Sequence, residues 1–180
     1  RVTLKKTYYI ESWWQWVKFF VLSFIIAFIL QAFILVPMKI EGNSMEDTLT
    51  SNSYVITERF SKIERFDIIV FHLNDGTNYV KRVIGLPGEE VIYKNDHLYI
   101  NGTLVEEPFL KDKISGRRQV FTRDFTSNDI FSTAIIPEDT YLVLGDNRPF
   151  SKDSLAFGGV HKSQIIGKVI KILPNFGVCS

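Results

Sequence analysis

The sequence predicts a mostly β domain, built as antiparallel sheets, that follows one N-terminal membrane helix. Residues 19–36 are apolar except for Ser23 and Gln31. A helix rises about 1.5 Å per residue, so this run would cross nearly all of a hydrocarbon core about 30 Å thick. After it, short runs rich in Val, Ile and Tyr alternate with polar turns. That alternation is typical of strands joined by hairpins.

Charges and aromatic residues on either side of the apolar run predict its orientation. Basic residues precede it and acidic residues follow it, at Arg1, Lys5, Lys6 and Lys18 and at Glu41, Glu46 and Asp47. Membrane proteins keep their basic flank inside, and tryptophans, here Trp13, Trp14 and Trp16, gather at the interface. We therefore expect a cytoplasmic segment at 1–18, a membrane helix at 19–36 and an extracytoplasmic β-rich domain at 37–180.

A cleaved secretory signal is the alternative interpretation of the same run. Such a signal has an apolar core of about 7–15 residues and a pair of small residues at its cleavage site. The run at 19–36 is longer, and residues 35–39 (Leu-Val-Pro-Met-Lys) contain no small pair. A retained anchor in the lipid bilayer is therefore the favoured interpretation, with Pro37 ending the helix.

Composition limits the chemistry that the domain can perform. The chain has 180 residues and a formal net charge of +1, which gives no reason to expect a nucleic-acid surface. Cys179 is the single cysteine, so clustered cysteine sites for zinc or iron–sulfur centres are excluded. We expect no metal and no cofactor.

The strand pattern also separates a core from an insertion. We expect strands at 54–56, 67–72, 77–85, 90–93, 97–100, 141–144 and 165–172. The residues at 74–76 (Asn-Asp-Gly) and 95–96 (Asn-Asp) are those that tight hairpin turns favour. Residues 104–137 are more polar and are predicted to be an insertion between core strands, with loops and a short strand at 119–121.

Two residues suggest nucleophilic catalysis. Ser44 follows a Gly-Asn turn directly after the predicted membrane segment, and Lys81 lies in a strand among Val, Ile and Tyr. A serine hydroxyl is a weak nucleophile until a base takes its proton. Burial lowers the pKa of a lysine, which can then act as that base. The alternative is that Lys81 extends its ammonium to the surface, and the strand pattern by itself favours this.

A histidine base is a further alternative, because serine–histidine–aspartate triads are the commoner design. His97 and His161 fall in a predicted turn and a late loop. His72 ends a predicted strand and is the one plausible histidine base.

A third stretch joins the first two. Residues 145–158 read Gly-Asp-Asn-Arg-Pro-Phe-Ser-Lys-Asp-Ser-Leu-Ala-Phe-Gly. With residues 42–49 and 81–89, they make the chain resemble the bacterial type I signal peptidases of the Gram-positive kind. That family carries the boxes Gly-x-Ser-Met-x-Pro-Thr-Leu, Lys-Arg-Val-Ile-Gly-Leu-Pro-Gly-Asp and Gly-Asp-Asn-Arg-x-x-Ser-x-Asp-Ser-Arg-x-Phe-Gly in this order. The resemblance covers nearly the whole chain.

The resemblance implies roles for the residues of the three boxes. Ser44 would be the nucleophile, Lys81 its general base, and Ser151 a hydroxyl that orients Lys81. The Ser44 backbone N–H would be one oxyanion donor, with Gly42 and Asn43 as candidates for the second. The remaining residues would hold the late loop against the dyad, and they are Asp146, Asn147, Arg148 and Asp153.

The resemblance also implies the fold, substrate and location. The fold would be a signal-peptidase-like antiparallel catalytic core with a variable cap at 104–137. The substrates would be exported preproteins, cut after a small-x-small motif at the end of the signal peptide. The enzyme would be a single-pass membrane protein with its catalytic domain on the extracytoplasmic face.

Three departures from the family boxes keep other functions open. Asp47 replaces a proline, Glu89 replaces an aspartate, and Leu155 replaces an arginine that pairs with the aspartate at position 153. An unpaired carboxylate is costly if buried. Arg82 and Arg148 are the candidates to replace the lost cation.

Asp47 and Leu155 are the features that favour an inactive homologue, which would act as a chaperone or assembly factor for surface proteins. The presence of Ser44, Lys81 and Ser151 favours the enzyme. A weaker alternative is a related protease that cuts itself or a regulatory protein.

Overall fold

The computed structural model describes residues 13–28, 35–39, 43–46, 48–49, 53–73, 76–114 and 120–173. The chain separates into two compact units, Arg1–Val36 and Pro37–Ser180. The strand pairings that position the site lie in the second unit.

The N-terminal unit contains a helix at residues 13–28 whose apolar side chains are exposed, including Trp13, Phe20 and Phe24. Among the residues described, no helix is both long and apolar enough to cross a membrane. Of the predicted span 19–36, the part at 29–34 lies outside the described residues.

The predicted end of that span is wrong. Leu35 and Val36 begin a strand, β1 (Leu35–Lys39), and Pro37 lies inside it rather than ending a helix. Strand β1 is at the edge of its sheet. A proline is tolerated there because an edge strand has one side on which its missing N–H is not needed.

The larger sheet has seven strands in the order β1-β2-β11-β3-β4-β9-β10. The strands after β1 are β2 (Tyr54–Glu58), β3 (Ile68–His72), β4 (Asn78–Gly85), β9 (Thr140–Leu144), β10 (Val160–His161) and β11 (Ile165–Leu173). The described pairings of β2, β3, β4, β9, β10 and β11 are antiparallel. The strands expected from the sequence in this sheet are therefore confirmed in kind and order.

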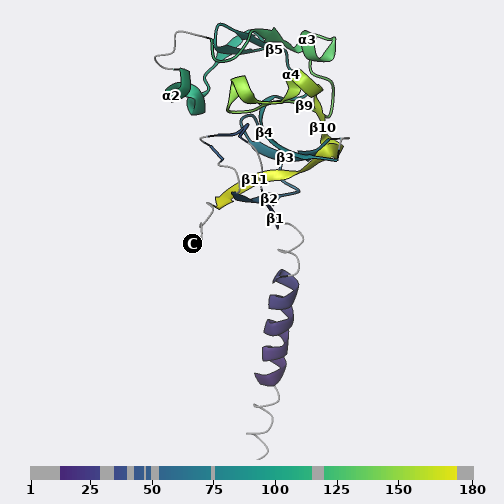
Figure 1. Cartoon of the computed structure of the whole chain (residues 1–180). Coiled ribbons are helices and arrows are strands. Elements are labelled where there is room, and N and C mark those ends of the chain that lie inside the picture. Colours follow the sequence, from purple (N-terminus) through teal and green to yellow (C-terminus); the bar gives the residue numbers. More distant parts are fainter. Residues whose placement is uncertain are drawn as a thin grey trace, which may run out of the picture. The chain divides into compact units, whose positions relative to one another are not determined.

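The smaller sheet has four strands in the order β7-β6-β5-β8. Its strands are β5 (Val91–Lys94), β6 (His97–Ile100), β7 (Thr103–Val105) and β8 (Phe125–Thr126). Asn95 and Asp96 both have positive φ, at 51° and 60°, as the two central residues of a type I′ hairpin turn do. Figure 1 shows this sheet at one end of the second unit and the β2–β11 edge of the larger sheet at the other.

Short helices fill the connections between strands. They are the 3₁₀ helices η1 (Pro108–Leu110), η2 (Arg148–Phe150) and η3 (Lys162–Gln164), and the α-helices α2 (Lys111–Ile114), α3 (Ser127–Phe131) and α4 (Ser154–Phe157). Because the smaller sheet starts at Val91, it takes residues from both sides of position 104, where the cap was expected to begin. The cap boundaries at 104–137 therefore stay a prediction.

The prediction of a short strand at 119–121 is wrong for the two residues of it that the structure describes. Val120 and Phe121 are not in a strand, and Gln119 lies outside the described residues. The backbone N–H groups of Phe121 and Thr122 donate to the Asp96 carboxylate at 3.0 and 2.7 Å. A carboxylate at the turn thus takes the hydrogen bonds that a strand ladder would need.

Strand β4 lies where three clusters of buried side chains meet. Val80 packs with Met45 and Leu49, Val83 with Phe71 and Val143, and Ile84 with the residues of the smaller sheet. Both faces of β4 are therefore covered, and Lys81 lies in the middle of the strand.

Candidate active site

Lys81 is held in place by the backbone of β4. It pairs opposite Ile69 of β3, and pairing with β9 begins at the next residue, where Arg82 lies opposite Leu144. The residue is 2% exposed. Burial lowers its pKa to about 8, against the opposing effect of the Asp153 and Asp146 carboxylates. The surface position of Lys81 that the strand pattern alone favours is therefore wrong, and the buried alternative is the one observed.

The Lys81 ammonium lies against the Ser44 hydroxyl. The Nζ atom is 2.5 Å from Ser44 Oγ, and it also donates to the Val80 carbonyl at 3.1 Å. Half of the amines would be neutral near pH 8, and a neutral amine in contact with a hydroxyl can take its proton. The structure therefore brings together the two residues that the sequence paired as nucleophile and base.

Ser44 lies in a short turn rather than in a strand. The Glu46 N–H donates to the Asn43 carbonyl at 3.1 Å, and the Leu49 N–H donates to the Met45 carbonyl at 2.7 Å. Met45 and Leu49 are both 1% exposed and anchor the turn in the core, while Ser44 stays partly exposed. The serine is thus accessible, and the residues that follow it are fixed by packing.

The late loop, residues 145–153, docks on this turn. The Asn147 backbone N–H donates to the Ser44 carbonyl at 3.0 Å, and its side-chain amide donates to the Asn43 carbonyl at 3.1 Å. The amide also donates to Glu46 Oε2 at 3.3 Å. Asn147 therefore holds the nucleophile turn from both its backbone and its side chain.

A buried ion pair ties the late loop to the Lys81 strand. Arg82 Nε donates to Asp146 Oδ1 at 2.8 Å and Nη2 to Oδ2 at 2.6 Å, and the Asp146 side chain is fully buried. The Thr48 hydroxyl donates to Asp146 Oδ2 at 2.5 Å. One carboxylate thus connects β4, the late loop and the Ser44 turn.

A second buried pair ties the late loop to the smaller sheet. Arg148 Nη2 lies 2.5 Å from Glu107 Oε1, and Arg148 Nε donates to the Gly145 carbonyl at 3.0 Å. Burial lowers the pKa of the Arg148 guanidinium and the Glu107 carboxylate raises it, with a net increase. Burial also raises the pKa of Tyr93, which donates to Glu107, to about 12. The positive charge of Arg148 is thus balanced by the negative charge of Glu107 inside this buried network.

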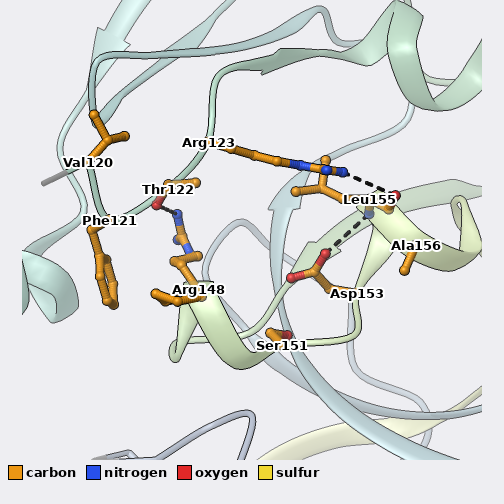
Figure 2. Close-up of a pocket in the computed structure, with 10 residues that line it drawn as sticks. Val120, Phe121, Thr122, Arg123, Arg148, Ser151, Asp153, Leu155 and Ala156 are labelled. Atoms are coloured by element: carbon orange, nitrogen blue, oxygen red, sulfur yellow. Dashed lines mark hydrogen bonds between the residues drawn. The ribbon is translucent and has the colours of Figure 1, made fainter.

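Ser151 lies in the late loop beside Asp153 (Figure 2). Its Oγ atom is buried and has no partner of full hydrogen-bond geometry among the described residues. It lies close enough to the Asp153 carboxyl to lower the pKa of that group. A Cβ at Gly145 would collide with the Ser151 side chain and with the Ser44 carbonyl oxygen, so glycine permits this close approach. Ser151 and Lys81 share no hydrogen bond in this arrangement, and the orienting role of Ser151 stays a prediction.

Asp153 is buried and caps helix α4. It accepts from the Leu155 N–H at 3.1 Å and from the Gly145 N–H at 3.4 Å. Burial raises the pKa of its carboxyl, and these N–H groups and the Lys81 ammonium lower it. With Leu155 where the family boxes carry an arginine, the Asp153 carboxylate is stabilised by two backbone donors and by the positive charge of Lys81.

The two arginines expected to compensate for Leu155 have other partners. Arg82 pairs with Asp146 and Arg148 pairs with Glu107. The expectation that one of them replaces the lost cation at Asp153 is therefore wrong.

A cavity of about 510 Å³ opens beside Ser151 and Asp153. Arg123 reaches across it and donates to the Leu155 carbonyl at 3.3 Å, as Figure 2 shows.

The other sequence predictions fall at the margin of the site or outside it. Glu89 pairs with Arg65 and accepts from the Leu86 N–H, so it supports the turn after β4. Gly42 and Asp47 lie outside the described residues. The His72 side chain is exposed and contacts Asn78, which gives the histidine alternative no support.

Sequence reasoning missed three residues that contact the loops of the site. Thr48 binds Asp146, Glu107 binds Arg148, and Lys113 of α2 donates to two loop carbonyls. Glu107 and Lys113 lie in the polar stretch interpreted as an insertion. Their local sequence is typical of solvated charges and carries no signal of these contacts.

Comparison with known proteins gives a consistent family assignment. The family model for signal peptidases, peptidase S26, matches residues 13–173. Signal peptidase IB of Staphylococcus aureus is 42% identical over 167 residues, which is 86% of each chain. Signal peptidase I of Bacillus caldolyticus is 45% identical over 163 residues, covering 87% of this chain and 86% of the relative.

A solved structure agrees with these matches. The crystal structure of a signal peptidase I from Enterococcus faecalis aligns with a TM-score of 0.56 at 42% identity, covering 60% of this chain and 97% of that one. The fold and these matches define a serine endopeptidase, a hydrolase of peptide bonds. The chain belongs to the signal peptidase family, peptidase S26, whose activity implies preprotein substrates that carry a signal peptide.

Proposed function

We propose that this chain is a membrane-anchored signal peptidase that uses Ser44 and Lys81 as a catalytic dyad. The observation that carries the proposal is the 2.5 Å contact between Lys81 Nζ and Ser44 Oγ, made by a lysine whose pKa burial lowers to about 8. Signal peptide removal needs a nucleophile that can be deprotonated near neutral pH, and this pair supplies one.

The reaction follows from the dyad. Neutral Lys81 takes the Ser44 proton as Oγ attacks the scissile carbonyl, and then gives that proton to the leaving amine. The signal peptide is left as an ester on Ser44, and water activated by Lys81 hydrolyses it. Ser151 is proposed to orient the lysine amine, since its buried hydroxyl lies in the loop that docks on Ser44.

Backbone donors are proposed to stabilise the oxyanion. The Ser44 N–H is one, and Gly42 and Asn43 are the candidates for the other. The hydrogen bond from the Asn147 amide to the Asn43 carbonyl supports the first donor, because that carbonyl and the Ser44 N–H belong to the same peptide plane.

The substrate is proposed to bind as an added strand. Residues 78–81 of β4 pair with β3, while the described pairing with β9 starts at Arg82. The side of β4 that faces β9 therefore has no described strand partner at residues 78–81. An extended peptide can add to such an edge through main-chain hydrogen bonds. Selection for small-x-small motifs follows from the family resemblance.

The anchor and topology belong to the same proposal. The apolar segment that starts at residue 19 and ends before β1 would cross the lipid bilayer, with 1–18 cytoplasmic and the β-rich domain, including a cap at 104–137, on the extracytoplasmic face. The exposed Trp, Phe and Ile side chains of the helix at 13–28 support a lipid environment for this segment.

The test uses the full chain in detergent with a preprotein that carries an Ala-x-Ala site. Wild type, Ser44→Ala and Lys81→Ala are compared, and products are identified by mass. We expect cleavage after the second small residue by wild type alone. Cleavage by Ser44→Ala would overturn the nucleophile assignment, and cleavage by Lys81→Ala would overturn the base assignment.

A further inference from the structure

Helix α2 lies in the stretch predicted as a cap and contributes one side chain to the loops around the dyad. The Lys113 ammonium donates to the Glu46 carbonyl at 2.9 Å and to the Asp146 carbonyl at 3.1 Å. Glu46 is two residues after Ser44, and Asp146 is in the late loop directly before Asn147. One ammonium thus bridges the turn that carries Ser44 and the late loop, which the Asp146–Arg82 pair ties to the strand that carries Lys81.

The bridge is placed where the nucleophile turn has little other regular structure. The turn is closed by a few backbone hydrogen bonds of its own and by the donors of Asn147. The Lys113 side chain is partly buried. Hydrogen bonds from a charged donor are stronger than neutral ones. The bond to the Asp146 carbonyl is partly buried, which limits its screening by salt, whereas the bond to the Glu46 carbonyl is exposed.

We propose that Lys113 is a positioning residue for catalysis, which holds the Ser44 turn against the late loop so that Ser44 Oγ stays within reach of Lys81. The inference rests on the proposed dyad. It makes the α2 segment part of the catalytic apparatus rather than a variable addition to it. Lys113 acts through the loop carbonyls and not through contact with the scissile bond.

The same helix provides a matched control. Lys111 is two residues away on α2 and pairs with Glu106 at 3.1 Å, but both of these side chains are largely exposed. Such surface pairs contribute little. Lys111→Met therefore removes the same charge and shortens the side chain in the same way, without touching a catalytic loop.

The experiment measures kcat and KM for cleavage of a signal-peptide substrate by the detergent-solubilised full chain. Lys113→Met should lower kcat by about ten- to a hundredfold, since small displacements of a reacting group cost this much, and should leave KM within about twofold. Lys113→Arg, which can still donate to two carbonyls, should recover much of the lost kcat. Thermal melting of Lys113→Met should match that of Lys111→Met.

Three results would overturn the inference. A kcat for Lys113→Met equal to that of Lys111→Met would show that the bridge does not position Ser44. A change confined to KM would make Lys113 a substrate contact instead. No recovery in Lys113→Arg, together with a lowered melting temperature in both variants, would indicate a purely structural role.

Ser44→Ala and Lys81→Ala separate failure of this inference from failure of the dyad. If both are inactive while Lys113→Met is fully active, the dyad stands and the bridge is rejected. If either retains full activity, the dyad is rejected whatever Lys113→Met does.

Discussion

The two halves of the proposed dyad are held by different kinds of structure. Lys81 lies in the middle of β4, where strand pairing and buried side chains on both faces fix it. Ser44 lies in a turn that is held by Asn147, by Lys113 and, through Thr48, by Asp146. The base is part of the sheet, whereas the nucleophile lies in a turn held against the sheet by two buried side chains, Met45 and Leu49, and by these polar contacts.

The difference separates two properties that catalysis needs. The pKa of Lys81 is set mainly by burial, which is a property of the folded sheet. The position of Ser44 depends on the packing of Met45 and Leu49 and, in addition, on hydrogen bonds from the late loop and from α2, which can change without unfolding the sheet. Changes in β4 should therefore affect chemistry and stability together, and changes around the turn should affect chemistry first.

The largest effect is expected from Lys81→Met, which removes the base from the sheet. Activity should fall by about a thousandfold or more, because loss of general base catalysis alone costs about 10²–10⁴-fold. Thermal stability at pH 7 should stay equal or rise. Folding lowers the pKa of Lys81 from 10.5 to about 8, so burying the charged amine at pH 7 costs free energy that methionine does not cost. Activity assays and thermal melts check both. A melting temperature several degrees lower would contradict the view that burial of this amine destabilises the fold.

The next effect is expected from Asp146→Asn, which breaks the link between strand and turn. Arg82 would be left buried without its carboxylate, and breaking a buried pair in this way costs about 3–5 kcal/mol. Denaturant unfolding should show a loss of this size, and activity should fall as well because the charged link between β4 and the late loop is lost. Asp139→Asn is the control, since Asp139 forms an exposed pair with Lys162 at 3.7 Å. Equal losses in the two variants would refute the special role of the buried pair.

The third prediction concerns pH and tests only Lys81, the dyad residue that lies in β4. The dyad needs neutral Lys81, so kcat/KM should rise about tenfold per pH unit below pH 8 and level off above it. The folded protein binds fewer protons at Lys81 than the unfolded chain between about pH 8 and 10.5, so this residue adds stability as pH rises through that window. A pH–rate profile governed by a group near pH 6.5 would instead indicate a histidine base.

The same contrast explains what could be predicted from the sequence. The central strands could be predicted because runs such as those at 68–72 and 78–85 are long, apolar and bounded by turn residues. Ser44, Lys81 and the late loop could be proposed from three motifs in order. The burial of Lys81 could not be predicted from its strand alone, because the local pattern favours an ammonium that reaches the surface.

The contacts that hold the turn could not be predicted. Glu107 and Lys113 look like ordinary surface charges, and their partners lie 41 and 67 residues away along the chain. Which charge meets which loop depends on how the smaller sheet packs, and no local pattern encodes this. The strand at 119–121 failed for a related reason, because a distant carboxylate, Asp96, takes the N–H groups that a ladder would use.

The smallest effect is expected from Leu155→Arg, which restores the family's cation beside Asp153. The negative charge of Asp153 raises the pKa of Lys81, and Leu155 lines the same cavity as that carboxylate. A guanidinium there would offset part of this charge and lower the pKa of Lys81 by about 0.3 units, which would raise activity at pH 7 about twofold. The pH–rate profile measures the shift, with Thr133→Arg, at an exposed position that does not line this cavity, as the control.

Arg123 sharpens this last prediction. Its guanidinium already lies against the Leu155 carbonyl, so it would repel a new arginine at 155 and reduce the shift. In an Arg123→Met background the shift produced by Leu155→Arg should therefore be larger than in wild type. An unmoved profile in both backgrounds would mean that Asp153 is compensated by its backbone donors alone. The presence of Leu155 instead of arginine would then have no effect on the pKa of Lys81.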